Sequence, residues 1–498
     1  MRRQDYGLTI GLAIAIASFF AMTCVHAQIA KWPQFRGLNC SGIAGEGQAP
    51  PVEFGPARNV LWKTTVPTGH SSPCIWGEHI FLTGFDKEEQ ELSVFSINRT
   101  DGSLRWRRVV PADTMAKGNT RNSPASATVA TDGERVYAYF SSFGLICYDF
   151  EGEQQWALPI PLPRARHGMG TSPILTGELV ILNNDDLNGS FVMAVDRRSG
   201  QIAWKKPQPR LTKFEQECYA TPVVWEDQVI VYRRGEIVAL NQETGEREWW
   251  FTSFTSGTST PVMANDTLFV ATYTMLGDPE IHIDLPDFDA LVSEDDQDGD
   301  SLISKEEFPE DLTIVYRPEM EEGEGRANLK DWFKIYDSNK DTFLNRAEWK
   351  KNAEVFQEFM SLAGLVAIKS DGKGDVTATG LLWREIKAVP EVPSPLYYDG
   401  LAYMIKNGGI ATCVNARTGE LLYRQRLGAS GPYFSSPIIA NGKIYIASLR
   451  GTVTVFEAGE HLKVLAKNEI GEEISATPAV VDGTLYLRTA EHLYAFRD

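Results

Sequence analysis

The sequence predicts an all-β fold, an eight-bladed β-propeller closed by an N-terminal strand, with a small α-helical insert in blade five. Three observations support this prediction. A proline that opens an apolar strand recurs eight times, a glycine and aromatic hairpin signal recurs out of phase with it, and an acidic segment interrupts one spacing. Repeats of this length are typical of propellers, in which each repeat forms one four-stranded blade.

The repeat begins with a Ser- or Thr-rich tripeptide that ends in proline, followed by an apolar strand and a Gly or Asp turn. The eight prolines are Pro73, Pro124, Pro173, Pro222, Pro261, Pro395, Pro437 and Pro478. Their spacings are 51, 49, 49, 39, 134, 42 and 41 residues. Six spacings fit one blade each, and the long one contains an insert of roughly 90 residues.

Most repeats also predict a β-hairpin, in which Asp or Asn ends a strand, Gly makes the turn and an aromatic residue follows four positions later. Gly provides the positive φ of the turn, and we expect the aromatic ring to dock one blade against the next. The pairs are Gly102 and Trp106, Gly152 and Trp156, Gly200 and Trp204, Gly245 and Trp249, and Gly419 and Tyr423, with Gly380 and Trp383 as a shortened copy. The last strand, 492–497, ends before such an aromatic appears, so we expect residues 59–63 to supply the missing strand and close the ring.

A resemblance to a known family rests on these motifs. The segment WPQFRG at residues 32–37, the Ser-Ser-Pro strand starts and the Thr-Gly-Glu-x-x-x-Trp hairpins resemble the pyrroloquinoline-quinone-like (quinoprotein alcohol dehydrogenase-like) propeller repeat family. The resemblance covers the chain outside the insert. It implies the fold more strongly than an activity, because the family includes quinone-dependent dehydrogenases as well as non-catalytic scaffolds of envelope assembly.

The N-terminus predicts export. A basic start, an apolar stretch at 8–22 and a small-residue site at 25–27 are typical of a cleaved signal peptide, which we place at residues 1–27. No later segment approaches about 18 uninterrupted apolar residues, so we expect no membrane span. A lipid anchor at Cys24 is the alternative, but the three residues before it lack a lipobox pattern. We therefore expect the mature protein in the periplasm or outside the cell.

Charge separates the insert from the rest of the chain. The net charge of −18 argues against nucleic acid or an anionic membrane as partner. Residues 275–375 hold 26 acidic and 11 basic residues, which marks this segment as an insert with its own purpose. We therefore assign 28–274 to blades one to five (first part), 275–375 to the insert and 376–498 to the remaining blades, and we expect a monomer.

Two twelve-residue segments of the insert match the EF-hand calcium loop, so the insert is predicted to be an EF-hand pair. Loops 296–307 and 337–348 place oxygen donors at the positions that ligate calcium. The predicted ligands are Asp296, Asp298, Asp300, Leu302, Ser304 and Glu307 in the first loop, and Asp337, Asn339, Asp341, Phe343, Asn345 and Glu348 in the second, with Leu302 and Phe343 acting through their carbonyls. Ile303 and Leu344 stand where paired loops form a short β-bridge. The alternatives are a solvated acidic loop and a loop pair that has lost its metal.

The loops depart from the EF-hand pattern at the sixth position. Ser301 and Thr342 replace the glycine that the sharp turn prefers, and a residue with a side chain is strained at positive φ. The second loop also has Asn339 in place of a third acidic ligand. We expect the first site to bind calcium more tightly, and both sites to act as structural clamps at the high calcium concentrations found outside cells.

The residue three positions before each repeat proline is expected at one end of the axial channel. His70, Arg121 and Tyr219 occupy such positions, and His167 lies close by. Together they would form a rim for an anionic or sugar-like ligand. The alternative is a rim that is merely polar and solvated. No Ser/His/Asp arrangement or paired-carboxylate spacing stands out, so the sequence names no catalytic residue.

The cysteine pattern bears on the choice of function. Without the leader five cysteines remain, with no C-x-x-C and no adjacent pair, so no zinc, haem or thioredoxin motif can be built. A disulfide between Cys40 and Cys74 is possible in an exported protein, but the spacing does not require it. The resemblance allows pyrroloquinoline quinone (PQQ) as cofactor. The cysteine pattern does not support this cofactor. We therefore favour a calcium-binding scaffold or binding protein of the cell envelope, with a protein or carbohydrate ligand, over the alternative, a PQQ-dependent alcohol or sugar dehydrogenase.

Overall fold

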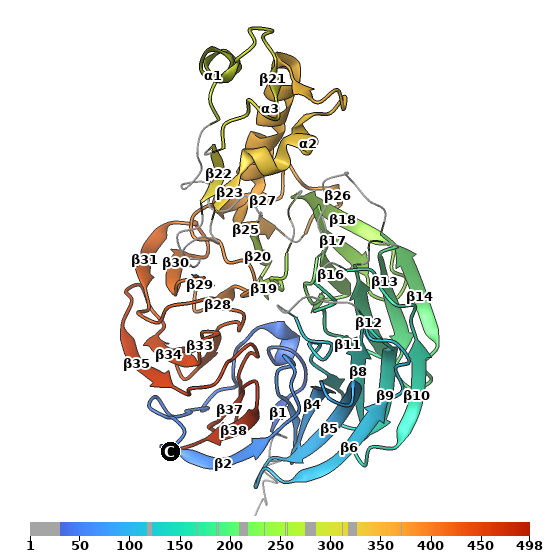
Figure 1. Cartoon of the computed structure of the whole chain (residues 1–498). Helices are drawn as coiled ribbons and strands as arrows, with labels where there is room; N and C mark the ends of the chain where they lie inside the picture. Colours follow the sequence, from blue (N-terminus) through green and yellow to red (C-terminus); the bar gives the residue numbers. More distant parts are fainter. Residues whose placement is uncertain are drawn as a thin grey trace, which may run out of the picture.

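The computed structural model describes residues 30–116, 122–165, 167–185, 187, 189–208, 218–233, 235–253, 255, 257–273, 285–310, 312–316, 326–369 and 371–498. Eight sheets of four or five strands, antiparallel except for one added strand in blade four, lie around a common axis, which confirms the eight-bladed propeller (Figure 1). The predicted signal peptide lies outside the described residues. None of the helices of the described chain is both long and apolar enough to cross a membrane.

Blades one to four follow the order of the chain. Blade one contains β1 (Lys31–Trp32), β3 (Cys74–Trp76), β4 (His79–Asp86), β5 (Glu91–Asn98) and β6 (Leu104–Val110). Blade two contains β7 (Ala130–Thr131), β8 (Arg135–Phe140), β9 (Gly144–Asp149) and β10 (Gln154–Pro159). Blade three contains β11 (Ile174–Thr176), β12 (Leu179–Asn184), β13 (Phe191–Asp196) and β14 (Ile202–Pro207). Blade four contains β15 (Val223–Trp225), β16 (Gln228–Arg233), β17 (Glu236–Asn241), β18 (Arg247–Thr252) and β26 (Gly374–Asp375).

Blades five to eight complete the ring. Blade five contains β19 (Val262–Ala264), β20 (Thr267–Thr272), β25 (Gly364–Lys369) and β27 (Leu381–Glu385). Blade six contains β28 (Leu396–Tyr398), β29 (Leu401–Lys406), β30 (Ile410–Asn415) and β31 (Leu421–Arg426). Blade seven contains β32 (Ile438–Ala440), β33 (Lys443–Ala447), β34 (Thr452–Glu457) and β35 (Val464–Glu469). Blade eight contains β36 (Ala479–Val481), β37 (Thr484–Arg488), β38 (His492–Phe496) and β2 (Val60–Thr65).

The helices of the insert lie between β20 and β25, so the insert interrupts blade five as predicted. Its elements are α1 (Phe288–Asp295), β21 (Ile303–Ser304), β22 (Thr313–Tyr316), β23 (Arg326–Asn328), the 3-10 helix η3 (Leu329–Trp332), α2 (Phe333–Tyr336), β24 (Phe343–Leu344) and α3 (Arg346–Leu362). The insert projects from the outer edge of the ring beyond blade five (Figure 1). After the insert, β26 adds a parallel strand to the outer edge of blade four.

The ring is closed by both ends of the chain. Strand β2 pairs antiparallel with β38 as the outermost strand of blade eight, which confirms the predicted closing strand. Arg99 of blade one holds the same junction from the other side, because its guanidinium bonds Asp482 of blade eight at 2.7 Å and Glu78 of its own blade at 3.2 Å. The closing strand thus joins residues from both ends of the chain in one blade.

A ring of backbone-to-hydroxyl hydrogen bonds joins the innermost ends of all eight blades. The hydroxyl of the Ser or Thr that opens each inner strand accepts the N–H of its counterpart in a neighbouring blade, at 2.9 to 3.2 Å. We call this set the hydroxyl ring, and its members are Ser72, Thr128, Ser172, Thr221, Thr260, Ser394, Ser436 and Thr477. All eight side chains are buried. The preference for Ser and Thr before the repeat proline therefore has a physical cause, because another residue would leave a buried N–H unpaired.

The hydroxyl ring corrects the predicted register of blade two. Its member there is Thr128, and the inner strand β7 starts at Ala130, so Val129 occupies the position of the repeat proline. The prediction that Pro124 is this proline is wrong. The residue three positions before Val129 is Ser126, and Arg121, which was placed on the rim by counting from Pro124, lies outside the described residues. Proline is not required at this position, because the hydroxyl and not the ring of Pro makes the bond between blades.

Aromatic residues of several hairpins dock neighbouring blades as predicted. The Trp106 indole N–H donates to the Phe150 carbonyl at 2.6 Å, and the Trp204 indole N–H donates to the Gln242 carbonyl at 2.9 Å. Each ring also covers the turn glycine of the next blade. A Cβ atom on Gly245 would lie 2.6 Å from the Trp204 ring, so the glycine is needed both for its φ of 69° and for this close approach. The repeat thus specifies the interface between blades.

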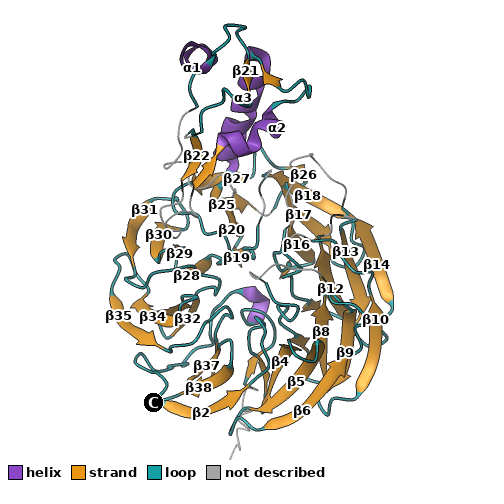
Figure 2. Cartoon of the chain, in the orientation of Figure 1, coloured by secondary structure: helices purple, strands orange, loops and turns teal. Residues whose placement is uncertain are grey.

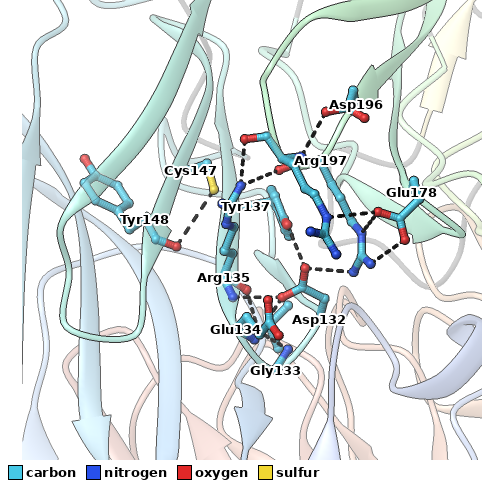
Figure 3. A network of polar contacts seen from close by, with 12 residues as sticks. Asp132, Gly133, Glu134, Arg135, Tyr137, Cys147, Tyr148, Glu178, Asp196 and Arg197 are labelled. Atoms are coloured by element: carbon cyan, nitrogen blue, oxygen red, sulfur yellow. Dashed lines mark hydrogen bonds and ion pairs between the residues drawn. The ribbon is translucent and has the colours of Figure 1, made fainter.

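A polar network adds to this interface between blades two and three (Figure 3). Arg197 of blade three bonds Asp132 of blade two at 2.9 Å and Glu178 at 2.6 Å, and the Tyr137 hydroxyl donates to the same Asp132 carboxylate at 2.8 Å. Burial alone would raise the pKa of Asp132, but hydrogen bonds from the N–H groups of Glu134 and Arg135, from Tyr137 and the charge of Arg197 hold it below its ordinary value. The network repeats the Arg99 arrangement between blades eight and one.

Candidate metal centre and axial rim

The two predicted calcium loops lie side by side in the insert. Ile303 pairs with Leu344 and Ser304 pairs with Phe343 in the antiparallel ladder of β21 and β24, which is the bridge that the sequence predicts. Beneath the loops lies a small apolar core of the insert. Its buried residues are Phe288, Leu291, Ile303, Phe308, Leu329, Phe333, Tyr336, Leu344 and Trp349.

The backbone of the first loop orients its carboxylates. Asp296 accepts the N–H groups of Gly299 at 2.7 Å and Ser301 at 2.9 Å, which wraps the loop around its first side chain. Glu307 accepts the N–H groups of Ser304 at 2.9 Å and Gln297 at 3.0 Å. These bonds from Ser304 and Gln297 hold the pKa of Glu307 below its ordinary range.

Carboxylate oxygens of Asp296, Asp298 and Glu307 lie within 4.8 Å of one another. Anionic oxygens repel one another at such distances, and a divalent cation with oxygen ligands would relieve that repulsion. Three carboxylates, the oxygens of Asp300 and Ser304 and the Leu302 carbonyl form the donor set that calcium prefers. The first loop therefore fits calcium.

The second loop has the same frame with a weaker donor set. Asp337 accepts the N–H groups of Asp341 and Thr342, and Glu348 closes a capping box with Asn345 at the start of α3. The Asn339 side chain donates its N–H to Asp341 at 2.8 Å. The amide of Asn339 is neutral, so the second loop offers a cation less negative charge than the first. This supports the prediction that the first site is the tighter one.

The backbone at the sixth loop position has the predicted conformation. Ser301 has a φ of 64° and Thr342 a φ of 75°, in the left-handed region that disfavours residues with side chains. The strain is expected to be greater for Thr342, because its Cβ is branched. In both loops the bonds from Ser301 to Asp296 and from Thr342 to Asp337 hold this conformation in place.

The axial rim precedes the hydroxyl ring in every blade. With the corrected register its members are His70, Ser126, Gly170, Tyr219, Thr258, Val392, Phe434 and Ser475, and all are partly exposed. Among the predicted ligand residues, the structure brings His167 and Tyr219 together, with ring centroids 6.2 Å apart. His70 belongs to a different part of the rim, beside Arg488. Burial, Arg488 and Lys87 lower the pKa of His70 to about 4, so it is neutral at pH 7.

The described rim is a poor match for PQQ, which carries three carboxylates. None of the eight described rim positions holds a side chain that is charged at neutral pH. The Arg488 guanidinium is already bonded to Ser71 and to the Pro67 carbonyl. The five cysteines of the described chain are buried, and Cys40 and Cys74 form no disulfide with each other. No redox step is derived from these residues.

Two features of the surface have no counterpart in the sequence motifs. A cavity of about 490 Å³ lies between blades four and five, and it is lined by Trp225, Glu226, Gln228, Glu248, Asp266, Asp371, Gly372 and Lys373. Glu472 joins blade seven to the closing strands, because it accepts from Tyr494 at 2.7 Å, from His492 at 2.9 Å and from Lys63 at 3.2 Å. The residues of both features come from turns and strands of different blades, so no linear spacing could have indicated them.

Comparisons with known proteins agree with this architecture. A family model described as outer membrane protein assembly factor BamB matches residues 57–184, 188–302 and 348–498. The crystal structure of BamB from Moraxella catarrhalis is similar at 13% identity and a TM-score of 0.51, covering 88% of this chain and 98% of that one. No curated protein matches the chain.

Redox enzymes are also among the similar structures. A europium-containing methanol dehydrogenase has 11% identity and a TM-score of 0.57, with 94% of this chain and 98% of that chain covered. Quinohemoprotein alcohol dehydrogenase from Comamonas testosteroni has 10% identity and a TM-score of 0.53, with 94% and 80% covered. At such identities the likeness shows the fold alone. Because the family model matches most of the chain, the protein belongs to the PQQ-like propeller family described as outer membrane protein assembly factor BamB.

Proposed function

We propose that the protein is an exported, calcium-binding propeller that acts as a scaffold or binding protein of the cell envelope. The observation that carries the proposal is the gathering of Asp296, Asp298 and Glu307 in a loop that is paired with a second loop of the same frame. The description of the family, an outer membrane assembly factor, supports the envelope and a protein ligand. A rigid ring with an attached insert suits the presentation of a recognition surface.

Calcium would act in this protein as a clamp. Asp296, Asp298, Asp300, Ser304 and Glu307 would hold the ion in the first loop, with the Leu302 carbonyl. In the second loop the ligands would be Asp337, Asn339, Asp341, Asn345 and Glu348, with the Phe343 carbonyl. Within the described residues, the apolar core of the insert has nine buried side chains. A core of this size gives little stability alone, so a bound ion would add a large share.

Calorimetry on the purified protein tests calcium binding. We expect uptake by the wild type, with the loss of uptake in the double variant E307Q/E348Q, because each substitution removes the bidentate ligand of one loop. The matched control is E306Q, which removes the same charge from the residue next to Glu307 without touching a ligand. Wild-type protein that takes up no calcium contradicts the proposal, and so does full uptake by E307Q/E348Q.

A second experiment separates the scaffold from the alternative, a PQQ-dependent dehydrogenase, which the structural similarity to two dehydrogenases keeps open. The protein is incubated with PQQ and calcium and assayed with an artificial electron acceptor across alcohols and sugars. The scaffold proposal predicts no turnover above a protein-free control. Turnover that depends on the added quinone would establish the dehydrogenase and refute the scaffold.

A further inference from the structure

The N-terminal segment, residues 30–44, crosses one end of the propeller axis. The Thr131 N–H of blade two donates to the Pro33 carbonyl at 2.8 Å, and Ile43 pairs with Ile439 of blade seven. Its short helix η1 (Leu38–Cys40) lies in the middle of the ring (Figure 2). The segment contacts residues that follow the hydroxyl ring, whereas the axial rim precedes it, so the two lie on opposite sides of the ring.

Arg36 of this segment is a buried cation without an acidic partner among the described residues. Its side chain is 0 % exposed. One terminal nitrogen, Nη2, donates to the carbonyls of Pro395 at 2.8 Å and Pro437 at 3.3 Å. The other two nitrogens, Nε and Nη1, are buried and have no hydrogen-bond partner within the described chain. A guanidinium remains charged at physiological pH, and an unpaired buried charge is strongly unfavourable.

Within the described residues, no carboxylate pairs with Arg36. The titratable group that lies close to it is the thiol of Cys40. Burial raises the pKa of that thiol to about 12 even beside the guanidinium, so it is neutral at physiological pH. Burial also lowers the pKa of Arg36 to about 10, which still leaves it charged.

Further hydrogen-bond donors surround the axis at the same level. Ser394 and Ser436, two members of the hydroxyl ring, directly precede the prolines whose carbonyls Arg36 bonds. Each ring hydroxyl accepts one N–H, and within the described chain none of the eight donates its own proton to an acceptor. A serine or threonine hydroxyl carries one proton that it can donate. The ring hydroxyls therefore add donors whose protons have no acceptor within the described chain.

The backbone around Arg36 is strained in a way that fixes its position. Arg36 has a φ of 58°, and Asn39 and Cys40 have φ values of 52° and 55°. Residues with side chains adopt this left-handed region rarely, and clusters of them are typical of binding sites. The surrounding contacts must therefore hold this strained backbone in place, and with it the Arg36 guanidinium.

We infer that the propeller axis holds a small monovalent inorganic anion, chloride or a similar halide, against Arg36 and the hydroxyl ring. The charge of Arg36 indicates a monovalent anion, because one guanidinium without a carboxylate partner is neutralised by one negative charge. Burial favours a small ion over a peptide, a sugar or a lipid, because Arg36, Trp32 and the members of the hydroxyl ring are buried. Water would satisfy the donors but would leave the charge of Arg36 without a counterion.

A crystal of the full mature protein, grown or soaked in bromide, locates the ion. Bromide replaces chloride and gives an anomalous signal. We expect a peak within hydrogen-bond distance of Nε or Nη1 of Arg36. Density without an anomalous signal at this place would identify water and overturn the inference, and so would bromide peaks that occur only at the outer surface.

Thermal unfolding in solution tests the same site by its effect on stability. At constant ionic strength, chloride is varied against gluconate, which is too large to enter. We expect the wild-type unfolding temperature to rise with chloride concentration, because an ion that binds only the folded state stabilises it. In R36M this dependence should disappear, whereas the control R58Q, which alters an exposed arginine of the same region, should keep it.

Two results of this experiment would contradict the site. One is a wild-type unfolding temperature that does not change with chloride, and the other is a dependence that persists in R36M. If R36M does not fold, R36K is compared with the wild type, since lysine keeps the charge but loses the planar set of donors. A lysine variant with an unchanged response to chloride would also overturn the inference.

Discussion

The propeller and its insert are stabilised by different means. Each blade is joined to its neighbours by the hydroxyl ring, and most interfaces also have a docked aromatic ring and large apolar clusters. The insert has one small apolar core and two loops whose carboxylates are held ready by backbone N–H groups. The difference teaches that the ring is held by direct contacts between its blades, whereas the insert combines a small core with loops whose carboxylates gather in one place.

The largest effect is expected from breaking a blade interface. The change W204A removes a buried indole that covers Gly245 and bonds the Gln242 carbonyl, and it should lower the free energy of unfolding by about 3–5 kcal/mol. Denaturant unfolding measures the change. In contrast, L104A at an exposed position should have little effect. Calcium uptake by folded W204A should equal that of the wild type, and its loss would show that ring and insert are not independent.

A smaller effect is expected from opening the hydroxyl ring. In S436A the Ser394 N–H loses its acceptor and stays buried, which should cost about 1–3 kcal/mol of stability. The control S199A alters a hydroxyl on an exposed turn. Chemical denaturation compares the two variants. Equal stability of S436A and S199A would mean that the ring adds nothing to the propeller.

The repeat could be predicted from the sequence because its chemistry is local. Proline opens the inner strand, glycine makes the hairpin turn and tryptophan follows at a fixed distance, so seven of the eight blades were placed correctly. Blade two was misplaced because Val129 stands where the others have proline, and only the hydrogen bonds of Thr128 reveal the register. The β-bridge between Ile303 and Leu344 was also predictable, since both loops fix it by position.

Other parts of the structure could not be predicted, because they depend on segments that are distant in sequence. The path of residues 30–44 across the axis, which places Arg36 against blades six and seven, leaves no periodic signal. The same holds for the cavity at Trp225 and for the contacts of Glu472. Such arrangements become visible only when the ring has been closed.

A glycine at the sixth loop position should relieve the strain of the backbone there. In T342G the residue at a φ of 75° has no Cβ, which should relieve about 1 kcal/mol and tighten calcium binding at the second site roughly fivefold. S301G should have a smaller effect, because serine is not β-branched. Calorimetry of both variants measures the affinities. Weaker binding by T342G would show that the side chain supports the site.

The smallest effect concerns the ring closure at low pH. Burial alone would raise the pKa of Glu472, but hydrogen bonds from Thr489, His492, Tyr494 and Lys63 lower it to about 2, against an ordinary value of 4.5. A lowered carboxyl pKa stabilises the folded state above the ordinary value, and this contribution is lost as the pH falls from 4.5 towards 2. E472Q should therefore unfold with a shallower pH dependence in this window. If the stability of E472Q falls with pH as steeply as that of the wild type, Glu472 does not contribute to stability in this window.

Hydrogen exchange with and without calcium tests the central difference between ring and insert most directly. We expect calcium to slow amide exchange in α1, in the two loops and in the start of α3, while the strands of the propeller exchange at the same rates in both conditions. In E307Q/E348Q the calcium effect should vanish. Exchange in the insert that is the same with calcium and with a chelator would contradict the account.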